Sequence, residues 1–242
     1  MKIHTFKAAT LAFGYLVSGA KASLIFSHVG ANDPTTEGWI DSGSGTLVTT
    51  GGVMNDLGTG VDSWFVDDPT AVSGSLTHYV QVPDAMTISQ ASALGWTLSV
   101  NARMVTSSGS GIPGMKARYH NGTSTRFGML FDRETDGDPS VELIGGGAFI
   151  LDGAGDGEYH LYELIYDPIA GSADLFVDGV ERISNYAGYT GPATTRVDWG
   201  ANSSSTTGRG HFNSVEFSVV PEPSAILLFG LGYLSLTFRR SR

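Results

Sequence analysis

The chain has 242 residues, of which 33 are glycine and none is cysteine, and it carries a formal net charge of −10 at pH 7. Without cysteine it has no disulfide, no thiolate metal ligand and no cysteine nucleophile. The excess of acidic over basic residues argues against a nucleic-acid partner, because phosphate binding needs clustered Lys and Arg. A glycine-rich composition with only 16% charged residues favours turn-rich β structure.

Residues 1–22 predict a secretory signal peptide. Lys2 and Lys7 form a positive region before an apolar run from Ala8 to Val17, and Ala20 and Ala22 form the small-x-small pattern of a cleavage site before Ser23. A buried N-terminal helix is the alternative, but it does not account for the coincidence of charge, length and cleavage pattern. We therefore expect signal peptidase to act here and the mature protein to be exported.

The segment from Ser23 to Val220 is expected to form one domain. Its net charge is −15, because six of the 14 Lys and Arg residues but only one of the 24 Asp and Glu residues lie outside it. Such an excess of like charge keeps an exported protein soluble. The first part, Ser23 to Asp62, is rich in Gly, Thr and Asp and is expected to supply an edge strand and loops.

Alternation of apolar and polar residues dominates the rest of this domain. From Thr97 to Met104 every second residue is apolar, which predicts a strand with one buried and one solvated face. Similar alternation occurs in three further stretches, 76–82, 127–131 and 215–219. Asp-Gly pairs predict tight turns at 136–137, 156–157 and 178–179. The only helical pattern is short and runs from Asp84 to Leu94.

Between Glu158 and Glu181 the chain shows a strand, a turn, a second strand, an Asp-Gly pair and the start of a third strand. The closing segment 197–219 continues the pattern. This succession resembles the laminin-G and concanavalin A-like jelly-roll superfamily, over about residues 60 to 220. The resemblance and the many short strands predict an all-β fold, an antiparallel jelly-roll β-sandwich. A signal helix and a short C-terminal hydrophobic helix are expected to flank it.

The densest acidic cluster, Asp132, Glu134, Asp136 and Asp138, is a candidate calcium loop. Its carboxylates alternate along the chain, and the glycine between the last two allows a sharp turn. However, Leu143 occupies the position that a bidentate glutamate takes in a helix-loop-helix calcium site. Since β patterning lies on both sides, a polar hairpin loop is the favoured interpretation.

The same run has a superficial likeness to the paired carboxylates of jelly-roll glycoside hydrolases. Those enzymes need an acid and a nucleophile or base held at a fixed separation by a stiff strand. Residues 134–138 lack the apolar spacers of such a strand, end in Asp where that family has Glu, and contain a turn-forming glycine. Hydrolysis is therefore the third and least favoured hypothesis for function.

Aromatic side chains that stack on sugar CH groups offer another candidate site. Four lie in loop-like contexts and are candidates for a sugar platform: Trp39, Trp64, Tyr119 and Tyr189. Trp96 and Trp199 flank core strands and are expected to be structural. The isolated histidines lack the spacing of a transition-metal site, so His160 is expected to be packed or hydrogen-bonded within its hairpin.

The last 22 residues have three ordered parts. They are Pro221, Glu222 and Pro223, an apolar stretch from Ala225 to Phe238, and Arg239, Arg240 and Arg242. At about 1.5 Å per residue the apolar stretch spans about 21 Å, which is less than the ~30 Å hydrocarbon core of a bilayer. The three parts resemble the PEP-CTERM sorting signal of Gram-negative bacteria. This module also circulates as an ice-binding protein C-terminal domain, a label that brings no ice-binding chemistry to this chain.

The PEP-CTERM resemblance implies a route for the protein. An exosortase in the inner membrane would recognise the signal and process the chain near Pro221, Glu222 and Pro223. The terminal arginines favour the cytoplasmic side of the membrane, which leaves the domain outside. After an intermediate at the inner membrane, the protein would reach the cell surface or the extracellular matrix, where polysaccharide is the candidate partner.

These features predict an exported, exosortase-sorted protein with a non-catalytic jelly-roll domain, for which glycan binding is the first hypothesis. A structural or adhesive surface component without a small ligand is the alternative. Calcium at the run from Asp132 to Asp138 is the only candidate cofactor.

Overall fold

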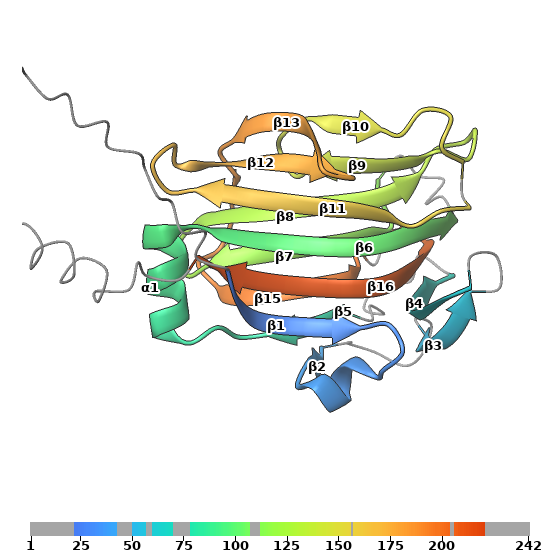
Figure 1. Ribbon diagram of the computed structural model, residues 1–242, viewed down its shortest axis with the longest axis horizontal. Coiled ribbons are helices and arrows are strands. Elements are labelled where there is room, and N and C mark those ends of the chain that lie inside the picture. The colour runs from blue at the N-terminus through green and yellow to red at the C-terminus, as the bar shows by residue number, and fades with distance from the viewer. Residues whose placement is uncertain are drawn as a thin grey trace, which may run out of the picture.

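The computed structural model describes residues 22–42, 50–56, 60–69, 78–106, 112–155, 157–203 and 206–220. Two eight-stranded antiparallel sheets face each other and form a β-sandwich (Figure 1). The predicted all-β sandwich is therefore confirmed. The expected signal helix and the C-terminal hydrophobic helix at 225–238 lie outside the described residues.

The first sheet, sheet A, contains eight strands: β1 (Ser23–Val29), β3 (Thr50–Asp56), β4 (Val61–Asp68), β6 (Trp96–Thr106), β11 (His160–Asp167), β12 (Ser172–Val177), β13 (Val180–Tyr186) and β16 (Gly208–Val219). Their order is β13-β12-β11-β6-β16-β4-β3. The long strand β16 pairs with β4 through its first half and with β1 through its second half. The N-terminal segment thus supplies edge strands, as expected.

The second sheet, sheet B, contains β2 (Ile40–Asp41), β5 (His78–Gln81), β7 (Met115–Asn121), β8 (Thr125–Arg133), β9 (Pro139–Leu143), β10 (Ala148–Ile150), β14 (Tyr189–Thr190) and β15 (Thr195–Ala201). Their order is β10-β9-β8-β7-β15-β5-β2, and β14 pairs with β8. The neighbours β7 and β15 are far apart in the sequence, so crossovers between the two sheets build this surface.

An aromatic core joins the two sheets. Buried and half-buried side chains alternate along β6, as the pattern from Thr97 to Met104 predicts. Trp96 and Trp199 are fully buried, which confirms their expected structural role. Trp96 of sheet A packs edge-on against Tyr119 of sheet B, with ring centroids 5.0 Å apart.

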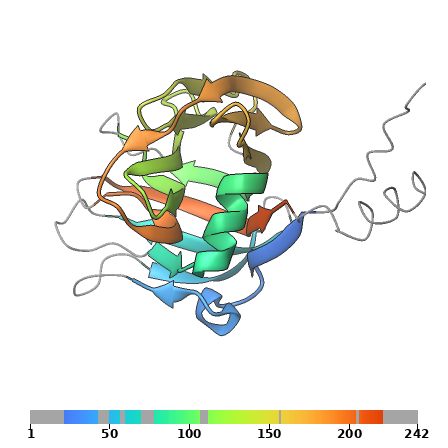
Figure 2. The same cartoon turned by 90° about the vertical axis from the view of Figure 1, so that its left-hand side faces the viewer.

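The helix α1 (Ala85–Leu94) forms where the helical pattern lies and covers one end of the sandwich (Figure 2). Asp84 caps its N-terminus, because its Oδ1 accepts from the Thr87 amide at 2.7 Å. Gly95 ends it at a φ of 100°, where a Cβ would lie 2.7 Å from the Tyr166 carbonyl oxygen. Within the described residues, no helix has the length and apolar character needed to cross a bilayer.

The predicted turns that lie in described residues are present. Asp178 and Gly179 both have a positive φ, 51° and 74°, as a two-residue type I′ hairpin requires. Gly137 has a φ of 103° in the turn between β8 and β9. Asp156, in the third predicted turn, lies outside the described residues.

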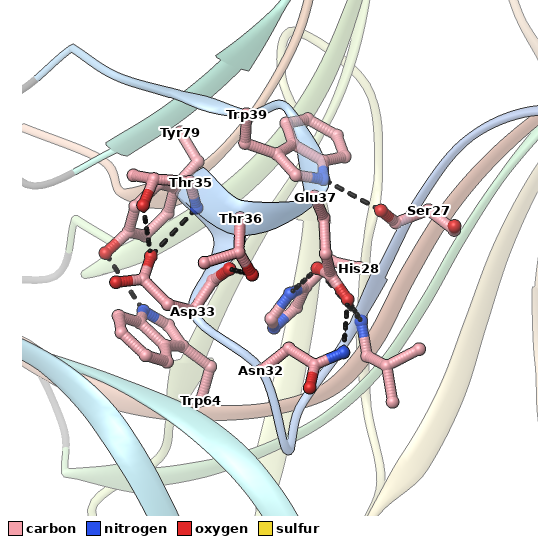
Figure 3. A network of polar contacts seen from close by, with 11 residues as sticks. Ser27, His28, Asn32, Asp33, Thr35, Thr36, Glu37, Trp39, Trp64 and Tyr79 are labelled. Atoms are coloured by element: carbon pink, nitrogen blue, oxygen red, sulfur yellow. Dashed lines mark hydrogen bonds and ion pairs between the residues drawn. The ribbon is translucent and has the colours of Figure 1, made fainter.

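A polar network fixes the short 3-10 helix η1 (Pro34–Glu37) to the core (Figure 3). His28 donates from Nδ1 to Glu37 Oε2 at 2.7 Å, and its ring stacks on Trp199. The other oxygen of Glu37 accepts from the Val29 amide and from Asn32 Nδ2. Burial lowers the pKa of His28, so the ring is neutral at pH 7 and its Nδ1 proton binds the carboxylate.

Replacing Glu37 with Ala is expected to destabilise the domain by about 2 kcal/mol, because the buried Nδ1 of His28 and the Val29 amide lose their acceptor. Chemical denaturation measures this free energy of unfolding. Glu181→Ala, at an exposed position of β13, is the matched control and should stay within about 0.5 kcal/mol of the wild type. Equal stability of the two variants would contradict a pinning role for Glu37.

Candidate functional site

The outer face of sheet B carries a group of charged and imidazole side chains. On β7 the buried apolar residues 115, 117 and 119 point into the core, so the residues between them point outward. The same alternation places Arg196 and Asp198 of β15 on the outer face. We call this group the charged face of sheet B: His78, Lys116, Arg118, His120, Arg196 and Asp198.

Asp198 lies at the centre of the charged face and is fully buried. Arg118 binds both of its oxygens, from Nε at 2.9 Å and from a terminal nitrogen at 2.8 Å. Arg196 adds an ion pair at 3.0 Å. Burial raises the pKa of Asp198, but the hydrogen bonds and charge of Arg118 outweigh burial and hold it below its usual range. The carboxylate is therefore ionised and fixes both arginines.

Lys116 sits beside this ion pair and is only 2% exposed. Its ammonium makes no ion pair with a described carboxylate, since the nearby Asp198 is shared by the two arginines. Burial lowers the pKa of Lys116 to about 7, and the positive charge of Arg118 acts in the same direction. Lys116 therefore gains and loses its proton near neutral pH. Perturbed groups of this kind are concentrated at functional sites.

Two histidines complete the charged face. His78 and Lys116 both pair with Gly200, from opposite sides, so they flank a position that has no side chain. Burial lowers the pKa of His78 to about 4 and that of His120 to about 3, so both rings are neutral at pH 7. His78 Nδ1 and His120 Nε2 are buried and have no hydrogen-bond partner.

Gly128 of β8 makes room for Arg118. A Cβ at this position would lie 2.9 Å from Arg118 Cγ and 2.7 Å from Ile144 Cδ1. A side chain here would displace the guanidinium from Asp198, so the ion pair of the charged face requires a glycine at this position.

A pocket of about 280 Å³ opens on the same side of sheet B, over β8, β9 and β10. Asp132, Glu134, Ser140 and Glu142 contribute its polar lining. Leu130 pairs with Lys116 on one side and with Glu142 on the other, so only one strand separates the pocket from the charged face. Arg133 and Thr135 also line the pocket, so its lining carries both signs of charge.

The run from Asp132 to Asp138 contains a hairpin turn, which was the favoured interpretation of this sequence. Asp138 accepts the Gly153 and Gly155 amides, at 2.7 and 2.8 Å, and Asp136 accepts the Asp138 amide. Asp132 and Glu134 line the pocket instead. Among the residues that the structure describes, no three His, Asp or Glu side chains are grouped to hold a metal ion.

The predicted aromatic sugar platform is wrong for three of its four residues. Trp39, Trp64 and Tyr119 are buried, and Trp64 donates from Nε1 to the Tyr79 hydroxyl at 2.9 Å inside the core. Trp64 lies on β4 and Tyr119 on β7, and both point into the core. Trp39 follows η1 and packs on Trp199. Tyr189 is half-buried on β14, near Arg118.

His160 behaves as predicted, since its Nδ1 binds Asp178 Oδ2 at 2.8 Å within the hairpin. Of the predicted processing residues, Ala22 is described and exposed, immediately before β1. The others, Ala20, Pro221, Glu222, Pro223, Arg239 and Arg240, lie outside the described residues.

The charged face was missed by the sequence-based predictions. Its signal is the alternation in 115–121, which puts Lys116, Arg118 and His120 on one side of a strand. That signal becomes informative only when β15 is known to lie beside β7, because Asp198 is 80 residues from Arg118 in the sequence.

Comparison with known proteins identifies the C-terminal segment. Residues 219–242 match the PEP-CTERM protein-sorting motif, which confirms the resemblance noted at Pro221, Glu222 and Pro223. This motif indicates export and a surface or extracellular location in a Gram-negative bacterium.

The sandwich itself is similar to parts of larger proteins. The chain is 23% identical to a sialidase of Vibrio cholerae serotype O1 over 217 residues, which is 86% of this chain and 25% of the sialidase. It therefore spans about a quarter of the length of the curated relatives it matches.

Two solved structures share the fold. A carbohydrate esterase of the Shiga toxin-encoding bacteriophage phi24B superposes with a TM-score of 0.59 at 13% identity, over 83% of this chain and all of that chain. A botulinum neurotoxin type C, whose cell uptake depends on interaction with two ganglioside molecules, superposes with a TM-score of 0.50 at 10% identity, over 81% of this chain and 48% of that chain. These similarities establish the β-sandwich.

Replacing Asp138 with Asn should lower the melting temperature, because one of the Gly153 and Gly155 amides then faces an NH2 donor in place of an acceptor. Asp138→Asn and Asp136→Asn are compared by differential scanning calorimetry, and the Asp138 variant should melt at the lower temperature. Excess EDTA should leave the wild-type melting temperature unchanged. A fall on EDTA addition that calcium reverses would show that this loop, or another part of the chain, holds a calcium ion.

Proposed function

We propose that the protein is an exported surface or extracellular-matrix component whose β-sandwich binds acidic polysaccharide on the outer face of sheet B, without chemically changing it. The observation that carries this proposal is the excess of positive charge on the charged face. Three cationic side chains, Lys116, Arg118 and Arg196, surround the single carboxylate of Asp198. They do so in a domain whose net charge is −15, with six of the 14 basic and one of the 24 acidic residues of the chain outside it.

The physical argument for an anionic ligand is electrostatic. Like charges gathered on a partly buried face repel each other, and an anion that enters removes both that repulsion and the cost of burying Lys116 without a partner. A carboxylate or sulfate on a sugar fits the hydrogen-bond donors of arginine and lysine.

The comparisons support a carbohydrate rather than another anion. The sequence relative is a sialidase, and the two structural neighbours are a carbohydrate esterase and a neurotoxin that interacts with gangliosides. The sorting motif would deliver the domain to a cell surface or matrix, where polysaccharides are exposed.

One observation favours an enzyme as the second candidate. Lys116, with a pKa of about 7, has the properties of a general acid or base at neutral pH. We favour binding because no carboxyl group of the acidic turn is free to act with it on the charged face: Asp138 is held by two backbone amides, and Asp132 and Glu134 lie at the pocket over β8 to β10. A structural component without a ligand is the remaining alternative.

Replacing Lys116 with Met should weaken binding of polygalacturonate at least tenfold at pH 6, because the charge is lost while the buried volume is retained. Wild-type affinity should also fall as the pH rises from 6 to 8, since Lys116 is charged below its pKa of about 7 and neutral above it. Isothermal titration calorimetry measures both effects.

The matched control is Arg182→Gln, which removes a positive charge from β13 in sheet A, where Arg182 packs over Phe149. It should bind like the wild type, and neutral dextran should bind to none of the proteins. Absence of binding across an array of acidic and neutral glycans would favour the structural alternative. Shortening of the polysaccharide by the wild type, but not by Lys116→Met, would favour the enzyme.

The domain boundaries are part of the proposal: a signal peptide at 1–22, the sandwich at 23–220 and the sorting segment at 221–242. Intact mass analysis of protein recovered from the native host and its medium should find an N-terminus at Ser23 and a C-terminus near Pro223. Replacing Glu222 with Ala should leave the full-length tail in the membrane fraction. A secreted wild-type protein that still contains Arg239 and Arg240 would contradict processing at this site.

A further inference from the structure

Both ends of the described domain leave the sandwich at one place. Ser23, the first residue of β1, pairs with Val219 of β16, which also pairs with Trp96 at the start of β6. Tyr166, at the end of β11, pairs with Trp96 from the other side. One line across sheet A therefore holds the beginning of the domain, its end and the strand that follows α1 (Figure 1).

The surface at this end exposes several large apolar side chains. All exposed residues of α1 are uncharged, and Met86 is 70% exposed. Ile169, in the turn between β11 and β12, is 96% exposed. Leu24, Val82 and Val220 are further exposed apolar side chains on the segments that meet here. We call these five residues the tether face.

Packing holds the parts of the tether face together. A Cβ on Gly95, at the end of α1, would lie 3.4 Å from Pro168 and 3.7 Å from Val220, so the turn that carries Ile169 and the chain exit both lie against the end of the helix. The Val220 amide donates to the Gly95 carbonyl at 3.1 Å. The nearby carboxylates are occupied locally: Asp84 caps α1, and Asp167 accepts the Ile169 amide.

Chain length brings this end close to a membrane. The apolar stretch of the sorting segment begins at Ala225, five residues after Val220. Five extended residues reach at most about 17 Å, and each headgroup layer is about 6 Å thick. While that stretch is inserted in the bilayer, the chain exit at Val220 is therefore held within about 11 Å of the lipid surface. Exposed apolar side chains held there gain free energy by entering the interface.

We propose that the tether face docks on the lipid bilayer while the C-terminal sorting segment is inserted, so that the sandwich stands with α1 against the membrane and the β8–β9 turn away from it. The contact is formed by Met86 and Ile169, with Leu24, Val82 and Val220 around them. This proposal rests on the sorting motif and is independent of glycan binding.

The absence of cysteine allows a direct test with the full-length chain in vesicles of phosphatidylethanolamine and phosphatidylglycerol. A nitrobenzoxadiazole label at Met86→Cys should be quenched at least twofold more by nitroxide on the lipid acyl chains than a label at Thr135→Cys. Phe127, at the start of β8, packs on Trp96 and so lies at the end of the sandwich that carries the tether face. Thr135 follows the other end of β8 and therefore lies at the opposite end of the sandwich. Equal quenching of the two labels would overturn the proposal.

A second variant separates docking from simple tethering. Val82→Asp and Ile169→Asp, introduced together in the Met86→Cys protein, should reduce the quenching by half or more, because charged side chains leave the interface. Both positions are exposed, so the melting temperature should be unchanged. Unchanged quenching would overturn docking. A Met86 label shielded from water but not quenched by the lipid would also overturn it, and would assign this face to the folded-back C-terminal segment or to a second copy.

Discussion

With no cysteine in the chain, the two sheets are joined by the side chains that they bury between them, and the rest of the structure depends on this constraint. The aromatic rings supply most of the large contacts across the interface. Trp96 meets Tyr119 at 5.0 Å, and Phe131 meets Tyr162 at the same distance. Each residue that fills this interface places its neighbours along the strand on the outside. The outer residues of β7 are therefore fixed as firmly as its core residues.

The charged face lowers the stability of a domain that is otherwise stabilised by apolar burial. A buried ion pair such as Asp198 with Arg118 seldom stabilises a protein more than well-packed apolar residues would, although losing one partner is costly. Lys116 adds a second cost, because it is buried without a carboxylate of its own. Gly128 and Gly200 add a third, since a glycine within a strand packs poorly. The proposed anionic ligand would offset these costs, which are concentrated on one face of one sheet.

Local sequence patterns predicted what depends on local geometry. Strand alternation, the Asp178-Gly179 turn and the Asp84 cap each follow from a few adjacent residues. The turn-like neighbours of Trp39 led to a wrong prediction of its environment, because burial depends on where the loop folds. Trp39 donates from Nε1 to the Ser27 carbonyl, and its ring packs on Trp199. The charged face needed the pairing of β7 with β15, which no local pattern contains.

The register of the strands also separates the two surfaces on which function would depend. The tether face lies at the strand ends, where Ser23, Val219 and Trp96 are aligned, whereas the charged face lies on the side of sheet B. Contact at a strand end and contact at a sheet face do not compete for the same surface. A sandwich attached through its C-terminus would therefore keep the outer side of sheet B away from the attachment point both before and after processing. For this reason, loss of glycan binding and loss of membrane docking are expected to follow from different substitutions.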